Sequence, residues 1–219
     1  MPIEVSGPMN DVEIDGSKAS VKVETVSGDV TLRGGEGNIE LSSVDGDVAV
    51  TGANGRFKLS AINQGVTASR LTGQADIETV NGDILLDNVQ LDALDASSVS
   101  GNLWLNGTLK DQGRYQLESH DGDIQVVMAD QPNARVTVST YSGELSSDFA
   151  VGVSHLNSKE NVGFTLGGGG ARLDLNSFSG RIQLLKLSSV DATRRALKSG
   201  HPGSGKPSKA KQKSDDSDE

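Results

Sequence analysis

The sequence contains no cysteine, so no disulfide stabilises the fold and a packed core has to hold it together. Only seven of the 219 residues are aromatic, which means that this core must consist mainly of Val, Leu and Ile. Proline is scarce, with 5 residues, and no run of 18 apolar residues occurs, which argues against a Pro-rich disordered chain and excludes a transmembrane helix. Glycine, by contrast, is abundant, with 27 residues.

The net charge of -10 is distributed unevenly along the chain. Residues 192–219 contain seven basic and four acidic side chains, so residues 1–191 carry a net charge of -13. Because an acidic surface repels phosphate, we do not expect this part of the chain to bind nucleic acid. The basic tail ends in Asp215-Asp216-Ser217-Asp218-Glu219, which leaves it at most a weak attraction to an anionic membrane surface.

A short phrase recurs with a period of 18 residues. Val26-Ser27-Gly28-Asp29-Val30 returns as Val44-Asp45-Gly46-Asp47-Val48 and as Val80-Asn81-Gly82-Asp83-Ile84. Degenerate copies follow at steps of 19, 21, 21 and 37 residues. The glycines of these phrases are predicted to be structural turn residues: Gly28, Gly46, Gly82, Gly101, Gly122, Gly143 and Gly180.

Alignment of the copies produces columns of apolar residues, such as Val12, Val30, Val48, Val66 and Ile84. Within each copy apolar and polar residues alternate, as expected for half-buried strands. A further column, which includes Val26, Val44, Ile62 and Val80, is also assigned to the interior, and its member His120 is expected to pack near Tyr141 and Phe178. An 18-residue unit is too short for a βαβ crossover but forms one coil of stacked short strands.

We therefore predict an all-β fold, a parallel β-helix (β-solenoid) with 18–21 residues per coil. The apolar offsets do not fit the three equal faces of a left-handed hexapeptide helix, which favours a right-handed coil. An antiparallel β-sandwich is the rival fold. The predicted solenoid domain spans residues 1–190 with an irregular loop within 147–170, a short capping helix spans 191–197, and a disordered tail spans 198–219.

The strand pattern begins abruptly at Ile3, and the first residues lack the basic and apolar regions of a signal peptide. Open solenoid ends present unpaired strand edges. We expect that either an N-terminal segment, such as a leader or anchor, is missing, or the open end stacks on a partner, with end-to-end self-association as one form of this.

The repeated phrases resemble the bacterial DUF4097 family of adhesin-like β-strand-repeat proteins, as does the segment from Gly168 to Gly180, GGGARLDLNSFSG. The resemblance covers roughly residues 8–187. It implies a β-solenoid without catalytic residues or cofactors, and a location in the bacterial cell envelope, in the periplasm or at the surface.

Two groups of residues are candidates for binding. The column after the repeat glycine contains Asp29, Asp47, Asp83 and Asp123, which could form a ladder for Ca²⁺ or could simply accept backbone hydrogen bonds in turns. Trp104 occupies an outward-facing slot, and Leu85 is expected beside it on the neighbouring coil. Such a pair can contact a protein or a sugar ring, unless a loop such as 147–170 covers it.

From these observations we predict a non-enzymatic scaffold of the cell envelope that binds a protein or glycan ligand. A structural element that self-assembles through its ends is the alternative. A polysaccharide-active enzyme is a third possibility, although the sequence contains neither a G-x-S-x-G elbow nor an H-E-x-x-H motif.

Overall fold

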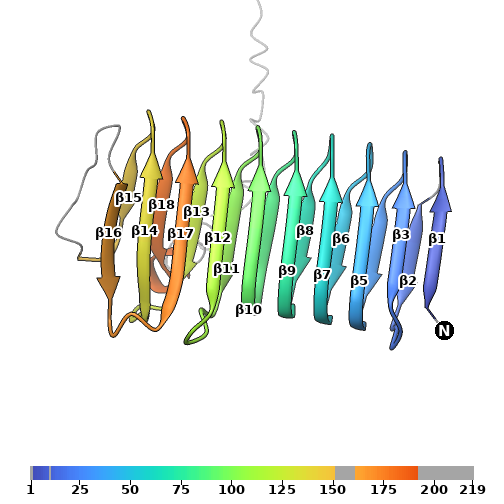
Figure 1. Ribbon diagram of the computed structural model, residues 1–219, viewed down its shortest axis with the longest axis horizontal. Coiled ribbons are helices and arrows are strands. Elements are labelled where there is room, and N and C mark those ends of the chain that lie inside the picture. Colours follow the sequence, from blue (N-terminus) through green and yellow to red (C-terminus); the bar gives the residue numbers. More distant parts are fainter. Residues whose placement is uncertain (1, 10, 151–160, 192–219) are drawn as a thin grey trace, which may run out of the picture.

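Figure 1 shows a computed structural model of the chain, which describes residues 2–9, 11–150 and 161–191. The described residues form 18 strands, and nearly all neighbouring strands pair in parallel. Each coil contributes one strand to each of two facing sheets, so the chain winds along a single long axis (Figure 1). The predicted fold class, an all-β parallel solenoid, is confirmed.

The two sheets are named here A and B. Sheet A contains β1 (Ile3–Gly7), β3 (Val21–Thr25), β5 (Glu36–Ser43), β7 (Asn54–Ala61), β9 (Thr72–Thr79), the second half of β10 (Ile84–Ser98), β12 (Arg114–Ser119), β14 (Ala134–Thr140), β16 (Asn161–Leu166) and β17 (Ala171–Ser177). Sheet B contains β2 (Val12–Asp15), β4 (Val30–Arg33), β6 (Val48–Thr51), β8 (Val66–Ser69), the first half of β10, β11 (Leu103–Gly107), β13 (Ile124–Met128), β15 (Leu145–Ser147) and β18 (Ile182–Lys186).

The core lies between the two sheets and is built from the repeat columns. In sheet B, Val30 pairs with Val48, and Val48 pairs with Val66, an offset of 18 residues at each step. All three side chains are 0% exposed. Because each inward residue meets a similar residue on the next coil, small branched aliphatics fill this core with few aromatic rings.

One column predicted to be interior lies on the surface instead. Val26 is 49% exposed, and Ile62 and Val80 are each 40% exposed. Each residue of this column directly follows the last inward-facing residue of a sheet A strand, as Val44 follows Ser43. Because successive strand residues point to opposite faces, the column faces outward at the corner. The solenoid therefore carries a line of apolar side chains along this corner.

A buried hydroxyl stabilises the turn at the same corner. The Ser98 hydroxyl accepts a hydrogen bond from the Gly101 N–H (2.8 Å) and donates to the Gly82 carbonyl on the preceding coil (3.3 Å). Ser43 and Ser119 make equivalent bonds on their own coils. A hydroxyl three residues before the turn glycine thus connects consecutive coils.

The opposite corner uses a left-handed backbone conformation at 18-residue intervals. Gly16, Gly34 and Gly52 have φ values of 63°, 71° and 69°, and the same position is then taken by Arg70 (52°) and Asn88 (54°). This conformation costs a residue with a side chain roughly 1 kcal/mol, which the surrounding ladders offset.

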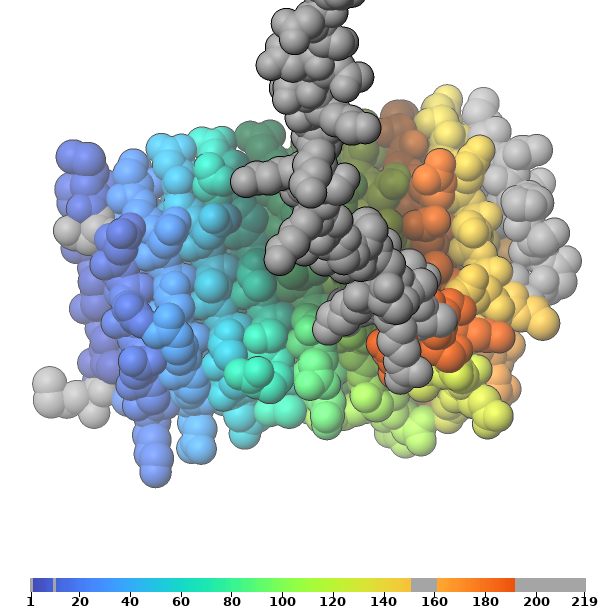
Figure 2. Space-filling model, turned by 180° about the vertical axis from the view of Figure 1, so that it is seen from behind, coloured from blue at the N-terminus to red at the C-terminus, as the bar shows by residue number. Residues whose placement is uncertain are grey.

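The last coil in the sequence is not the last in space. Strand β17 pairs with β12 on one side and with β14 on the other, so β17 and β18 lie between coils that precede them in the chain (Figures 1 and 2). Strand β16 then pairs antiparallel with β14 at the edge of sheet A. This insertion explains the 37-residue step in the repeat, because Gly180 stacks between Gly122 and Gly143.

Strand β16 occupies part of the stretch 147–170, for which the sequence predicts an irregular loop. Residues 187–191 are helical, and the rest of the predicted capping helix and the tail lie outside the described residues. Within the described parts of the chain, no helix has the length and apolar character needed to cross a membrane.

Candidate functional site

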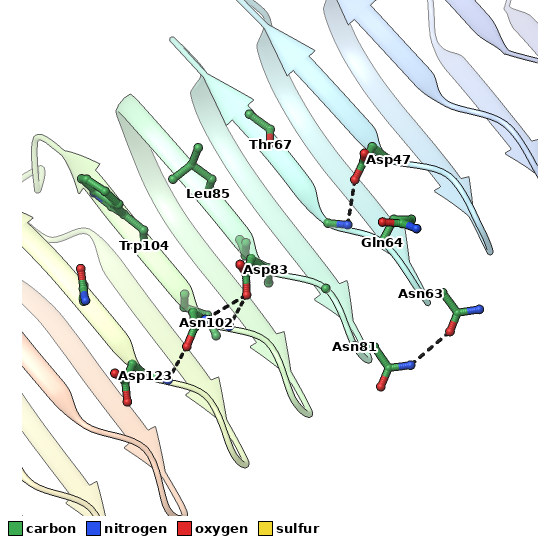
Figure 3. Close-up of a pocket in the computed structure, with 15 residues that line it drawn as sticks. Asp47, Asn63, Gln64, Thr67, Asn81, Asp83, Leu85, Asn102, Trp104 and Asp123 are labelled. Carbon is green, nitrogen blue, oxygen red and sulfur yellow. Dashed lines mark hydrogen bonds between the residues drawn. The ribbon is translucent and has the colours of Figure 1, made fainter.

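The structure places Leu85 and Trp104 side by side on the outer face of sheet B. Leu85 in β10 is the register partner of Trp104 in β11, and Thr67 and Gln125 continue the same row on either side (Figure 3). Leu85 is 38% exposed and Trp104 is partly buried. The row therefore presents two adjacent apolar side chains between polar neighbours.

A hollow of about 720 Å³ runs beside this pair, toward the corner formed by the repeat glycines such as Gly82 and Gly101, called here the glycine corner. Its polar lining comes from the turn residues of consecutive coils: Asp47, Asn63, Gln64, Asn81, Asp83, Asn102 and Asp123. Gly65 holds the place of the acidic side chain between Asp47 and Asp83, so the hollow lies where the Asp column is interrupted (Figure 3). Apolar and hydrogen-bonding groups thus lie along one surface depression.

The Asp column itself forms a ladder of backbone hydrogen bonds. Asp29 Oδ1 accepts the Asp47 N–H (2.9 Å), and Asp47 Oδ1 accepts the Gly65 N–H (3.0 Å). Asp83 accepts the Asn102 N–H (2.7 Å) and Asp123 accepts the Arg181 N–H (2.7 Å) in the same manner. The described residues contain no group of three or more acidic, His or Cys side chains placed to hold a metal ion. The carboxylates of this column are therefore spread along the turns, at most one per coil.

Side-chain amides form a second ladder at the rim of the hollow. Asn81 Nδ2 donates to Asn63 Oδ1 (3.1 Å; Figure 3). Asn63 Nδ2 in turn donates to Asp45 Oδ1 (2.6 Å). These bonds hold the amides in a fixed orientation along the corner. A ligand in the hollow would therefore meet a preorganised row of polar groups.

Sheet A carries a shallower hollow of about 350 Å³ around Ala93, between Arg56 and Arg114. Burial raises the pKa of the Asp95 carboxyl there, and the neighbouring Asp76 carboxylate raises it further. The 18-residue period does not predict this pair, because a β-bulge between Leu91 and Ala93 displaces the repeat by one residue. The lining contains no His, Lys, Ser or Cys, and its ionisable groups are the Asp76 and Asp95 carboxyls and the two arginines.

Three rings stack along the glycine corner. The His120 and Phe178 rings lie 4.6 Å apart at 17°, and the Phe178 and Tyr141 rings lie 4.8 Å apart at 6°. The prediction that His120 packs near Tyr141 and Phe178 is confirmed, although the cluster is exposed. An adjacent groove of about 670 Å³ is lined mostly by Ser, Thr and Asn side chains.

The fold and these sites define a repeat protein of the parallel β-solenoid class, with hollows on its faces and corners. The model of the family described as Toastrack DUF4097 matches residues 50–185. The chain belongs to this family. No curated protein and no solved structure matched the chain.

Family membership agrees with the resemblance drawn from the VSGDV-type phrases, and the match covers the repeats from β6 to β18. Membership of this family fits the solenoid architecture of the structure. The comparison assigns no ligand and no reaction, so the use of the hollows has to be argued from their own chemistry.

Proposed function

We propose that the protein is a non-enzymatic solenoid scaffold that binds a glycan in the hollow beside Leu85 and Trp104. The observation that carries this proposal is the position of the exposed Leu85 and the partly buried Trp104 along a depression lined by carboxylates and side-chain amides. The flat indole packs against the C–H face of a sugar ring. Asp83, Asn102 and Gln125 lie within the same lining and can exchange hydrogen bonds with its hydroxyl groups.

A glycan fits this lining better than a protein does. Protein interfaces draw most of their binding free energy from several clustered apolar or aromatic side chains. In the lining of this hollow, only Leu85 and Trp104 project outward among polar side chains. The turn ladders also fix the Asp and Asn side chains, which reduces the entropy lost on binding. Rigid polar groups around one aromatic ring favour a hydroxyl-rich ligand.

The chain offers a direct test because Trp104 is its only tryptophan. Titration of the protein with a panel of neutral and amino-sugar oligosaccharides should shift the emission of this single residue with a saturable curve. Trp104→Ala should abolish binding measured by calorimetry, and Leu85→Ala should weaken it about tenfold, which corresponds to about 1.4 kcal/mol.

Tyr141→Ala is the matched control, since it removes an exposed aromatic ring on a later coil of the same corner, outside the lining of the hollow. It should bind every oligosaccharide as the wild type does. If Trp104→Ala leaves all calorimetric isotherms unchanged, or if only peptides shift the emission, the glycan assignment is wrong.

Self-assembly through the open end is a second candidate that a specific observation favours. Within the described residues, β1 pairs with β3 alone and β2 with β4 alone. Ile3, Val5 and Ile14 are partly exposed at this end, while the equivalent residues one coil further are fully buried. Light scattering over a range of concentrations should show growing particles, and Val5→Lys should suppress them; particles of constant size would exclude this candidate.

The location in the bacterial cell envelope remains part of the proposal and is supported by the family resemblance alone. Fractionation of cells that express the natural gene would test it.

A further inference from the structure

Three arginines lie side by side on the outer face of sheet A. Arg114 in β12 is the register partner of Arg172 in β17, and Arg172 is in turn the partner of Arg135 in β14. All three are exposed. We call this set the arginine row; its strands lie next to one another in Figure 1.

The row exists only because of the inserted coil. Arg114 and Arg135 come from consecutive coils of the sequence, and Arg172 enters between them from a segment 37 residues beyond Arg135. No repeat column of the sequence predicts it, since the same position on earlier coils holds Asn38, Arg56, Gln74 and Ala93.

Like charges directly opposite each other on neighbouring strands destabilise a sheet. Among the described residues one carboxylate forms an ion pair with this row: the Arg172 Nε donates to Asp174 Oδ2 at 2.7 Å. The Asp76 and Asp95 carboxylates lie near one end of the row, in the hollow that Arg114 also lines. Neither the Arg114 nor the Arg135 guanidinium forms an ion pair within the part of the chain that the structure describes. The adjacent outward positions beside them hold the neutral side chains of Gln116 and Thr137. The row is thus a basic island on an acidic solenoid.

We propose that the arginine row binds an anionic polysaccharide, with carboxylate or sulfate groups on successive sugars. Strand neighbours are about 4.8 Å apart, so the row presents its guanidinium forks at short, regular intervals along a nearly straight line. Each fork can bind a carboxylate or sulfate through two parallel N–H donors. A flexible linear polymer can place its anionic groups over these donors one after another.

The rest of the surface favours this ligand over nucleic acid. Residues 1–191 carry a net charge of -13, and duplex DNA carries one charge per about 1.7 Å of its axis, so repulsion outside the three-residue row would be large. A polysaccharide with fewer charges along a thinner chain fits a single row. The site is also separate from the Trp104 hollow, which lies on sheet B.

The test uses the full-length protein and heparin as the anionic probe. Calorimetry in about 0.15 M NaCl compares the wild type with the triple variant Arg114→Gln, Arg135→Gln and Arg172→Gln. We expect the triple variant to bind heparin about tenfold more weakly, since exposed charge contacts each contribute a modest share. It should also unfold at the same or a slightly higher temperature, because the replacements remove like-charge repulsion.

The basic tail supplies the matched control. Lys206→Gln, Lys209→Gln and Lys211→Gln change the net charge by the same amount but leave the arginine row intact. This variant should retain heparin binding within twofold of the wild type. The proposal is overturned if the tail variant loses as much affinity as the row variant, if the row variant binds heparin as the wild type does, or if a DNA oligonucleotide binds the row more tightly than heparin.

Discussion

Gly101→Ala is expected to lower the free energy of unfolding by about 4 kcal/mol, which is a large part of the stability of a typical domain. A Cβ atom at residue 101 would overlap the Gly82 carbonyl oxygen of the preceding coil. Both partners belong to the backbone of stacked turns, so no side-chain rotation relieves the clash. The turn would have to open, which would also break the hydrogen bond between the Gly101 N–H and the Ser98 hydroxyl.

Urea denaturation followed by circular dichroism would measure this effect. Gly163→Ala is the matched control, because a Cβ atom there meets only the Val136 carbonyl oxygen, at 4.0 Å. This control should change the unfolding free energy by less than about 1 kcal/mol. A Gly101→Ala variant as stable as the Gly163→Ala variant would show that the coils do not stack as closely as described.

The same close stacking explains why the fold could be predicted from the sequence. Each coil places its residues directly over those of the previous coil, so the interior columns keep one environment and similar apolar residues, as in Val30, Val48 and Val66. The register of 18 residues is therefore visible in the sequence itself. The neighbouring positions of Leu85 and Trp104 follow from that register, since both occupy the same slot of consecutive copies.

The parts that could not be predicted are those where the column rule breaks. Insertion of β17 between β12 and β14 pairs residues from distant coils, and no local pattern encodes which edge a returning strand will join. The arginine row depends on that insertion. The exposed corner column escaped prediction for another reason: Val26 and Ile62 are apolar and periodic, and periodicity alone does not distinguish the inside of a turn from the outside.

Tyr115→Phe is expected to lower the free energy of unfolding by about 2 kcal/mol. The Tyr115 hydroxyl donates to the Leu91 carbonyl (2.6 Å) and accepts the Lys110 N–H (2.8 Å), and the side chain is buried. Phenylalanine keeps the ring in the core but leaves both backbone groups without this partner. Urea denaturation at about pH 8, where the hydroxyl is protonated, would measure this loss of unfolding free energy. The control is Tyr141→Phe, which changes an exposed tyrosine and should alter the unfolding free energy little.

The same hydroxyl gives the wild type a specific sensitivity to alkali. Burial raises the pKa of Tyr115 above its ordinary value of 10.0, and the nearby Asp92 carboxylate raises it further, against the opposing effect of the Lys110 N–H. The unfolded chain therefore releases this proton at a lower pH than the folded protein does. The stability that Tyr115 provides is complete below pH 10 and falls as the pH rises from there through the raised pKa.

Comparison of the two proteins isolates this contribution, because the other ionisable groups are the same in both. The unfolding free energy of the wild type should approach that of Tyr115→Phe as the pH rises above 10, so the difference measured at about pH 8 should shrink. A difference that stays constant up to the alkaline limit of folding would mean that the folded and unfolded chains release the Tyr115 proton at the same pH, and would contradict the raised pKa.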